Sequence, residues 1–372
     1  MIKRLLLLTG LAIVAVVLAH AAQWVWLGMF WWTDRYLPVS VPNYDAVGTL
    51  SYLAVITLQK ACCFAVPAFL FATGFFVAYA HRGKGPMAWK LVGNRLKALL
   101  IPYLIWSIVI FLGDYAQGRT YPPLEYARRL LVGEAVPAYY YVIVLCQLYI
   151  VSPLLVPLAR RHGRWLLLAA AAILLAVIGL FYWKLGAVMT GRESTTVEAI
   201  LTLTPNQSLA RWLFFFVGGL VAGYNLGPLK TWLVRHRWLL LAVAVLSLPL
   251  AVWETEWIFR ITDMDWRAGI FTLTGSLFAV SAILAFLSFE GMPPTCAKAL
   301  SALGSATFGI YLLHTTVLEV TARATQRYIP QVMAYPLLFQ LLLAAVAVGV
   351  PWVIMRLVLK SPARRWHRYL FG

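Results

Sequence analysis

The chain has 372 residues, of which 62% are hydrophobic and only 12% are charged, and its mean hydropathy is +0.80. This composition excludes a soluble globular protein, because such proteins carry about 25% charged residues. The formal net charge of +18 would suggest nucleic-acid binding in a soluble protein, but in a membrane protein an excess of Lys and Arg marks the cytoplasmic side. We therefore expect an all-α, polytopic membrane protein that does not bind nucleic acid.

Runs of apolar residues predict ten transmembrane helices in a single domain over 1–372, since one helical span needs about 20 apolar residues. The runs lie at about 5–22, 51–80, 98–116, 138–158, 165–185, 209–226, 238–253, 269–289, 302–322 and 333–359. Most of the 31 Lys and Arg residues then fall in alternate loops. By the positive-inside rule, this predicts a protein of the inner (plasma) membrane with both termini in the cytoplasm.

The first run, LLLLTGLAIVAVVLAHAA, contains His20 near its end. An ionisable residue inside the membrane usually faces a cavity or a partner, so His20 is a candidate general base; a packing histidine is the alternative. A third interpretation is a signal peptide, with Lys3 and Arg4 before the run and Ala19-His20-Ala21 as a cleavage site. Five aromatic residues favour a retained helix anchored at the interface. They are Trp24, Trp26, Phe30, Trp31 and Trp32.

A basic cytoplasmic loop precedes the third run, and Arg95 and Lys97 lie at its end. Guanidinium and ammonium groups bind phosphate oxygens, so these two side chains, with Arg82, Lys84 and Lys90, are candidates for a phosphate-bearing cytosolic donor. The alternative interpretation is a loop whose charges only set membrane orientation.

Two segments predicted outside the membrane, 187–208 and 254–267, are polar enough to receive a polyhydroxylated acceptor, although solvated loops have the same composition. Tyr139, Tyr140 and Tyr141 are typical of an interfacial aromatic belt. Gln147 lies deeper, where a polar side chain needs a partner, and is a candidate pocket residue.

The ninth run carries a second deep histidine, His314, with Glu319 five residues on. On a helix these two side chains diverge by roughly 140°, so they are poor direct partners. His314 and His20 have comparable depths and could meet in one outward-leaning cavity. The sequence has no CxxC, HExxH or GxSxG motif, and the four cysteines show no metal-ligand spacing. We expect no metal and no resident cofactor.

Six segments, taken in order, resemble the integral-membrane acyltransferase-3 family over nearly the whole chain. They are LAIVAVVLAH, PAFLFATGFF, RLKALLIPYLIW, YYYVIVLCQLYIVSPLL, FFFVGGLVAGYN and LGSATFGIYLLH. Within the family, the similarity is greatest to the exopolysaccharide O-acetyltransferase branch, which includes the membrane acyltransferase of the polysaccharide intercellular adhesin locus.

The resemblance implies an O-acyltransferase that moves an acyl group, usually acetyl, from cytosolic acyl-CoA as co-substrate to a carbohydrate hydroxyl outside the cytoplasm. It maps the family's histidines onto His20 and His314 and its basic motif onto Arg95 and Lys97. Tyr140, Gln147 and Glu319 are our candidates for the acceptor pocket. One departure is that the family's arginine eleven residues before the first histidine is Thr9 here, unless Arg4 supplies that function.

A positioned imidazole can take the proton of a sugar hydroxyl as it attacks the thioester, so direct transfer with His20 as base is preferred over a covalent acyl-histidine. The main alternative function is an exporter or flippase of a lipid-linked sugar or polysaccharide. A non-catalytic subunit of polysaccharide synthesis machinery, itself a candidate partner, is a third. The sequence specifies neither the sugar nor the acyl group.

Overall fold

The computed structural model describes residues 1–32, 42–82, 89–191, 205–262, 272–289, 291 and 293–372, and these contain helices and no strand. The main helices are α1 (Ile2–Trp31), α2 (Leu50–Ala61), α3 (Ala65–Ala80), α4 (Trp89–Ala116), α5 (Pro123–Val132), α6 (Tyr140–Met189), α8 (Leu209–Tyr224), α9 (Leu226–Arg235), α10 (Arg237–Thr262), α11 (Leu273–Ser288), α12 (Pro294–Ser305), α13 (Thr307–Tyr328), α14 (Pro336–Lys360) and α15 (His367–Phe371). The predicted all-α class is confirmed.

The count of ten spans is not reproduced among the described residues. Within the described residues, six helices are long and apolar enough to cross a membrane, or eight if each bent helix pair is one span. Two predicted runs lie in the single 50-residue α6, which is interrupted only by non-helical φ/ψ angles at His162. The run at 269–289 yields α11, whose 16 residues extend only ~24 Å, less than the ~30 Å of a hydrocarbon core.

Two apolar helix pairs are sharply bent in the structure. The axes of α8 and α9 differ by 106° and those of α12 and α13 by 81°. At the first bend, the Asn225 side chain donates from Nδ2 to the Val221 carbonyl at 2.9 Å, which satisfies one of the carbonyls that a helix end leaves open. The run predicted at 209–226 ends at the first bend, whereas the run at 302–322 continues across the second, so hydropathy alone predicts no break at Ala306.

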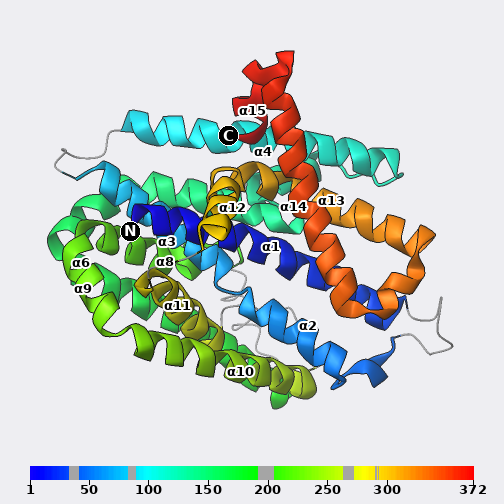
Figure 1. The fold of residues 1–372 in the computed structure, drawn as a ribbon, viewed down its shortest axis with the longest axis horizontal. Coiled ribbons are helices and arrows are strands. Elements are labelled where there is room, and N and C mark those ends of the chain that lie inside the picture. The colour runs from blue at the N-terminus through cyan, green and yellow to red at the C-terminus, as the bar shows by residue number, and fades with distance from the viewer. Residues whose placement is uncertain (33–41, 83–88, 192–204, 263–271, 290, 292) are drawn as a thin grey trace.

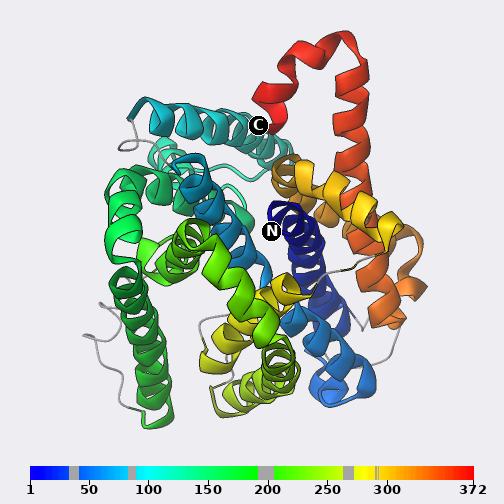
Figure 2. The same cartoon turned by 60° about the vertical axis from the view of Figure 1, so that its left-hand side comes forward.

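Helix α1 runs through the centre of the molecule, packed against α3, α12, α13 and α14 (Figures 1 and 2). Trp26 and Phe30, predicted as interfacial anchors, are buried at 7% and 1% exposure, so they belong to the core. At Gly10 a Cβ atom would lie 2.0 Å from the Leu300 carbonyl oxygen of α12. Removal of α1 as a signal peptide would therefore take away the centre of the bundle.

Helices α3 and α8 pack backbone against backbone through glycines. A Cβ on Gly74 would lie 2.1 Å from the Phe216 carbonyl oxygen, and one on Gly219 would lie 1.9 Å from that of Phe71. Small residues allow such an approach, which favours association of membrane helices through van der Waals contact. We call this contact the α3–α8 seam.

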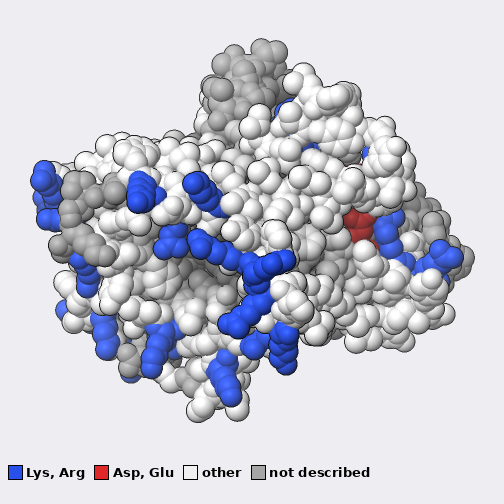
Figure 3. Space-filling model, turned by 90° about the horizontal axis from the view of Figure 1, so that it is seen from above, with Lys and Arg blue, Asp and Glu red and all other residues white. Residues whose placement is uncertain are grey.

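Basic residues concentrate at one end of the bundle. We call the end at which α1 begins the near end and the end at which α1 stops the far end; in Figures 1 and 3 the near end lies at the left. Figure 3 shows Lys and Arg gathered over the near-end half of one face, around a hollow, and acidic side chains only toward the far end.

The predicted loop at 254–267 begins as helix, because α10 continues to Thr262. Glu254 is buried there and accepts hydrogen bonds from the hydroxyls of Tyr182 and Thr274, so it is a structural group and no part of a solvated loop. Residues 263–267, with Asp263 and Asp265, lie outside the described residues, as does most of the predicted loop 187–208.

Candidate active site

The two deep histidines, carried by α1 and α13, lie side by side. The ring centroids of His20 and His314 are 5.1 Å apart, with the ring planes inclined at 53°. His314 is fully buried, whereas His20 is only partly buried and lines a cavity. The structure thus brings together two residues that are 294 positions apart along the chain (314 minus 20).

Hydrogen bonding fixes the protonation of the His314 ring. Its Nδ1 lies 2.6 Å from the Tyr311 carbonyl oxygen, and because a carbonyl can only accept, Nδ1 carries the proton. In the neutral ring, Nε2 then has a free lone pair, and it is buried with no hydrogen-bond partner among the described residues. His314 is therefore able to accept a proton or a hydrogen bond from its neighbour.

A cavity of about 470 Å³ opens beside His20 at the far end. Its walls come from the end of α1, from Tyr44, from the segment at Val136 and Pro137, and from α13. The α13 residues Thr315, Leu318 and Glu319 line it. The hydroxyl of Thr315 is buried without a protein partner in the described part of the chain, so it can bond a molecule in the cavity.

Glu319 takes part in ion pairs at the cavity wall. Its carboxylate lies 2.8 Å from an Arg323 guanidinium nitrogen and 3.9 Å from one of Arg119. These pairs occupy one side of the carboxylate, and a hydroxyl-rich molecule in the cavity would approach the other.

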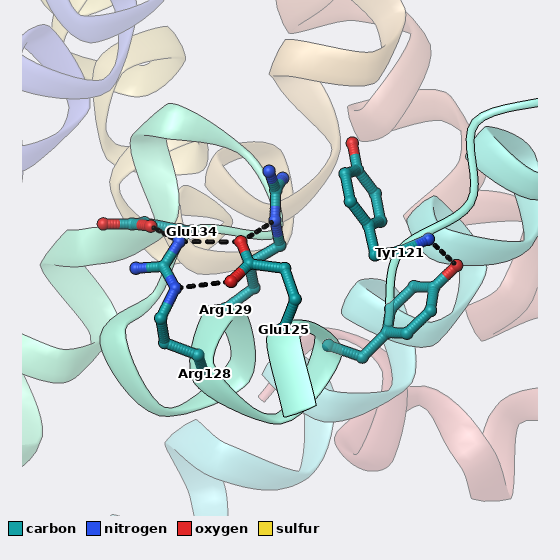
Figure 4. Close-up of polar contacts among 6 residues, drawn as sticks. Tyr121, Glu125, Arg128, Arg129 and Glu134 are labelled. Atoms are coloured by element: carbon teal, nitrogen blue, oxygen red, sulfur yellow. Dashed lines mark hydrogen bonds and ion pairs between the residues drawn. The ribbon is translucent and has the colours of Figure 1, made fainter. Parts of the chain in front are cut away.

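A charged network forms within α5 and the turn that follows it (Figure 4). Both Arg128 and Arg129 donate hydrogen bonds to Glu125, at 2.7 Å and 2.9 Å, and Arg128 also pairs with Glu134. The hydrogen bonds from Arg128 and Arg129 lower the pKa of Glu125 to about 2. Gly133 ends α5 with a φ of +75°, which turns the chain toward the cavity-lining Val136 and Pro137.

Arg95 and Lys97 are both exposed near the start of α4. Two residues apart on a helix, their side chains diverge by ~200°, so they do not form one clamp on the same face. Arg95 lies close enough to the Tyr149 phenol of α6 to interact with it electrostatically. By the same helical spacing, Lys97 lies on a different side of α4 from this contact.

Tyr140 and Gln147 lie on α6, and neither lines the His20 cavity. Tyr140 stacks on Trp212, with ring centroids 5.9 Å apart. Gln147 has a buried side-chain oxygen with no partner among the described residues, which keeps it a candidate contact for a ligand. Tyr139 and Tyr141, predicted in an interfacial belt, are buried instead.

A tyrosine cluster connects α6 to the histidine pair. Tyr141 packs edge-on against Tyr311 at 5.5 Å, and Tyr311 lies 5.7 Å from the His314 ring. The Tyr139 hydroxyl donates to the Leu312 carbonyl at 2.7 Å, and the Tyr311 hydroxyl donates to the carbonyl of Ala138. These bonds fix the turn of α13 that carries His314.

Arg4 does not substitute for an arginine near His20. Its guanidinium donates to the Phe286 carbonyl at the end of α11 and lies 4.7 Å above the Phe286 ring. Along α1, Arg4 is ~24 Å from His20. Thr9 donates its hydroxyl to the Leu6 carbonyl at 2.9 Å, so it is a helix residue at the α1–α12 crossing.

Sequence reasoning missed two residues that contribute to this site. Gln23, three residues after His20 on the same face of α1, forms a side-chain hydrogen bond with the His20 ring and lines the cavity. Gln340 of α14 is buried and donates to the Leu18 carbonyl at 3.1 Å, two residues before His20. The spacing of Gln23 from His20 was a usable signal, but nothing in the sequence pairs Gln340 with α1.

Among the described residues, no group of three or more His, Cys, Asp or Glu side chains is placed to hold a metal ion. The four cysteines are free thiols, and none of them lines the His20 cavity. Histidine is thus the candidate for proton transfer, with no thiol nucleophile beside it.

Comparison with known proteins identifies the class of protein, which is an acyltransferase. Residues 3–356 match the acyltransferase-3 family, described as an acyltransferase domain, and the chain belongs to that family. The match confirms the family resemblance seen in the sequence, and with the apolar helices it identifies a multi-pass membrane protein.

A curated relative is named "Probable poly-beta-1,6-N-acetyl-D-glucosamine export protein", from Staphylococcus aureus (strain MRSA252). It is 20% identical over 299 residues, which cover 80% of this chain and 81% of the relative. No solved structure matches the chain.

Proposed function

We propose that the protein is an O-acyltransferase that moves an acyl group, in the first instance acetyl, from cytosolic acyl-CoA to a hydroxyl of an extracytoplasmic polysaccharide or its lipid-linked precursor. The observation that carries this proposal is the His20–His314 pair at the wall of a cavity, in a chain of the acyltransferase family. The polysaccharide acceptor is supported by the name of the Staphylococcus aureus relative.

The proposed chemistry is direct acyl transfer. A sugar hydroxyl in the cavity loses its proton to a ring nitrogen of His20 while its oxygen forms a bond to the thioester carbon. The carbon–sulfur bond then breaks, and the CoA thiolate leaves and takes up a proton. General base catalysis of this kind contributes roughly 10²–10⁴-fold to the rate.

His314 acts in this proposal as a positioning residue. The free lone pair on its Nε2 can hold the His20 ring or receive its proton, because the two rings are adjacent and Nδ1 is occupied by the Tyr311 carbonyl. Thr315 and Glu319 are the candidates for binding further acceptor hydroxyls in the cavity.

The donor would reach the histidines from the near end, along the first half of α6. Arg95 would hold CoA phosphate oxygens at the mouth, with Lys97 as a peripheral contact. Tyr149 faces Arg95, and eight residues earlier Tyr141 contacts the cluster at His314, a distance of ~12 Å along the helix. The unpartnered oxygen of Gln147 lies between these two positions.

This proposal puts both termini in the cytoplasm of a cell whose inner membrane holds the protein. The concentration of Lys and Arg at the near end supports this orientation. An association with the machinery that makes the polysaccharide follows from such an acceptor.

A second candidate function is export of the polysaccharide, as the name of the relative suggests. In that case the histidines would line a conduit, and acyl-CoA would not be consumed. The two functions differ in one measurable reaction, the turnover of acyl-CoA by the purified protein.

The deciding experiment is replacement of His20. His20→Ala is expected to leave the membrane level near normal, because His20 is only partly buried, and to lower acyl transfer roughly 10²–10⁴-fold. His20→Gln is expected to do no better, since an amide can form the hydrogen bond but cannot accept the proton. The measurements are acetyl-CoA turnover by purified protein and mass spectrometry of surface polysaccharide.

His236→Ala is a matched control, because His236 is a partly buried histidine like His20 but lies near the α9–α10 junction, where it bonds the Trp232 carbonyl. Full acylation in the His20→Ala strain would refute the proposed mechanism. Loss of polymer export, with no acyl-CoA turnover by the wild-type protein, would establish the exporter function instead.

A further inference from the structure

A second cavity, of about 700 Å³, lies between α2 and α10 at the far end. It is lined by the apolar side chains of Leu53, Leu248 and Val252 and by Trp253, Glu256, Trp257 and Arg260, which we call its rim. We call it the α2–α10 groove. The two helices run next to each other in both ribbon views (Figures 1 and 2).

Two tryptophans give this groove an exposed aromatic surface. Trp253 and Trp257 are one helical turn apart on α10 and therefore lie on the same face, with 65% and 38% of their surface exposed. A flat indole ring offers apolar area for the carbon-bound hydrogens on one face of a pyranose ring, at little cost in conformational entropy.

A carboxylate lies beside these rings. Glu256 is half-buried on the same helix, and the Tyr52 hydroxyl of α2 donates a hydrogen bond to it. A carboxylate held in this way can accept further hydrogen bonds from sugar hydroxyls, and such charge-assisted bonds are stronger than neutral ones. Arg260, one turn further along, adds donors at the same rim. Flat aromatic faces next to fixed hydrogen-bonding groups are the chemistry that recognises a saccharide.

The groove lies close to the His20 cavity. Trp26 and Tyr44 line that cavity; Trp26 packs against Tyr52 at 5.3 Å, and Tyr44 packs against Phe259 of α10 at 6.3 Å. Tyr44 lines the cavity and Gly48 lines the groove. Because Gly48 is only four residues after Tyr44, the two residues are at most ~14 Å apart. The two openings therefore lie within the reach of a short oligosaccharide.

We propose that the α2–α10 groove is a second saccharide subsite, in which Trp253, Trp257 and Glu256 bind units of the polymer next to the unit that reacts at His20. This inference rests on the proposed polysaccharide acceptor. The affinity for the acceptor would then depend on its length. A polymer that occupies both openings binds more tightly than a single sugar, which occupies only the cavity.

The test is binding of a soluble β-1,6-linked N-acetylglucosamine oligosaccharide and of monomeric N-acetylglucosamine to the full chain in nanodiscs of one phospholipid composition, measured by calorimetry. Trp253→Ala is expected to weaken oligosaccharide binding about tenfold, in line with the apolar area lost, and to leave monosaccharide binding unchanged. Trp257→Ala and Glu256→Gln are expected to give smaller losses with the same selectivity, and Trp253→Phe to restore part of the affinity.

Trp238→Ala is the control, because Trp238 lies on the same helix with a similar exposure of 64%, at the opposite end. If folded Trp253→Ala and Trp257→Ala proteins bind the oligosaccharide like the wild type, the rings are membrane anchors and the subsite does not exist. The binding measurement does not require acyl transfer. A fully active His20→Ala protein would therefore refute the proposed mechanism without contradicting the subsite.

Discussion

The histidine cavity and the basic surface at the near end are built in opposite ways. His314 is fully buried, its Nδ1 is bonded to a carbonyl, and its ring faces His20 across 5.1 Å. Arg95 and Lys97 are exposed and point to different sides of α4. The first region is fixed by packing, whereas the second consists of solvated charges whose geometry depends on what they bind.

This difference shows where rigidity is needed in the proposed reaction. A base must be held near one atom of the acceptor, and a displacement of about 1 Å can cost a hundredfold in rate. Lys and Arg side chains attract the phosphate groups of a large soluble donor over a longer range, so flexible side chains are sufficient to bind them. Substitutions in the two regions should therefore affect different kinetic constants.

The largest effect after His20 itself is expected at His314. His314→Gln keeps a donor for the Tyr311 carbonyl but removes the ring that faces His20, and we expect kcat to fall about ten- to a hundredfold with little change in KM. The measurement is steady-state acyl transfer with a pH profile, beside a melting curve. A rise in KM alone, with kcat unchanged, would show that His314 binds substrate and does not position the base.

A smaller effect is expected at the donor surface, where substitutions of Arg95 and Lys97 should change the KM for acyl-CoA to different extents. Arg95→Ala should raise the KM for acyl-CoA about ten- to a hundredfold, the loss of one charge-assisted bond of roughly 1.5–3 kcal/mol. Lys97→Ala should change it less than about threefold, because Lys97 lies on a different side of α4 from the contact of Arg95 with α6. Arg95→Lys, which keeps the charge but not the planar fork, should lie between them. Equal effects of Arg95→Ala and Lys97→Ala would contradict the assigned geometry.

The smallest effect concerns the network of Figure 4. The pKa of Glu125 is lowered from 4.5 to about 2, so the charged form stabilises the folded state fully above about pH 4.5, and this contribution is lost as the pH falls toward 2. The melting temperature of the wild type should exceed that of Glu125→Gln slightly, by about 2 °C or less, near pH 6, since the pairs are solvent-exposed. This difference should shrink near pH 3. A difference that grows with acid would contradict the pairing.

The sequence predicted the helical class, the family and the proximity of His20 and His314, because the depth of an ionisable residue in an apolar run can be read directly. It did not predict the bend at Ala306, since the apolar run at 302–322 continues across it, and it marked the bend after Tyr224 only as the end of the run at 209–226. It also assigned Trp26 and Glu254 to surfaces. Their burial depends on partners from distant helices, such as Tyr52 for Trp26 and Tyr182 for Glu254, which no local pattern encodes.

The glycine contacts have a mechanical consequence. At Gly74 and Gly219 of the α3–α8 seam, and at Gly10 where α12 crosses α1, backbone meets backbone with no side chain between them that could change rotamer. A shift of one residue along either contact would push a Cβ atom into a carbonyl oxygen. Each of these two helix pairs should therefore move as a rigid unit, and we expect an opening that admits a polymer to come from other elements, such as α5 or the α2–α10 pair.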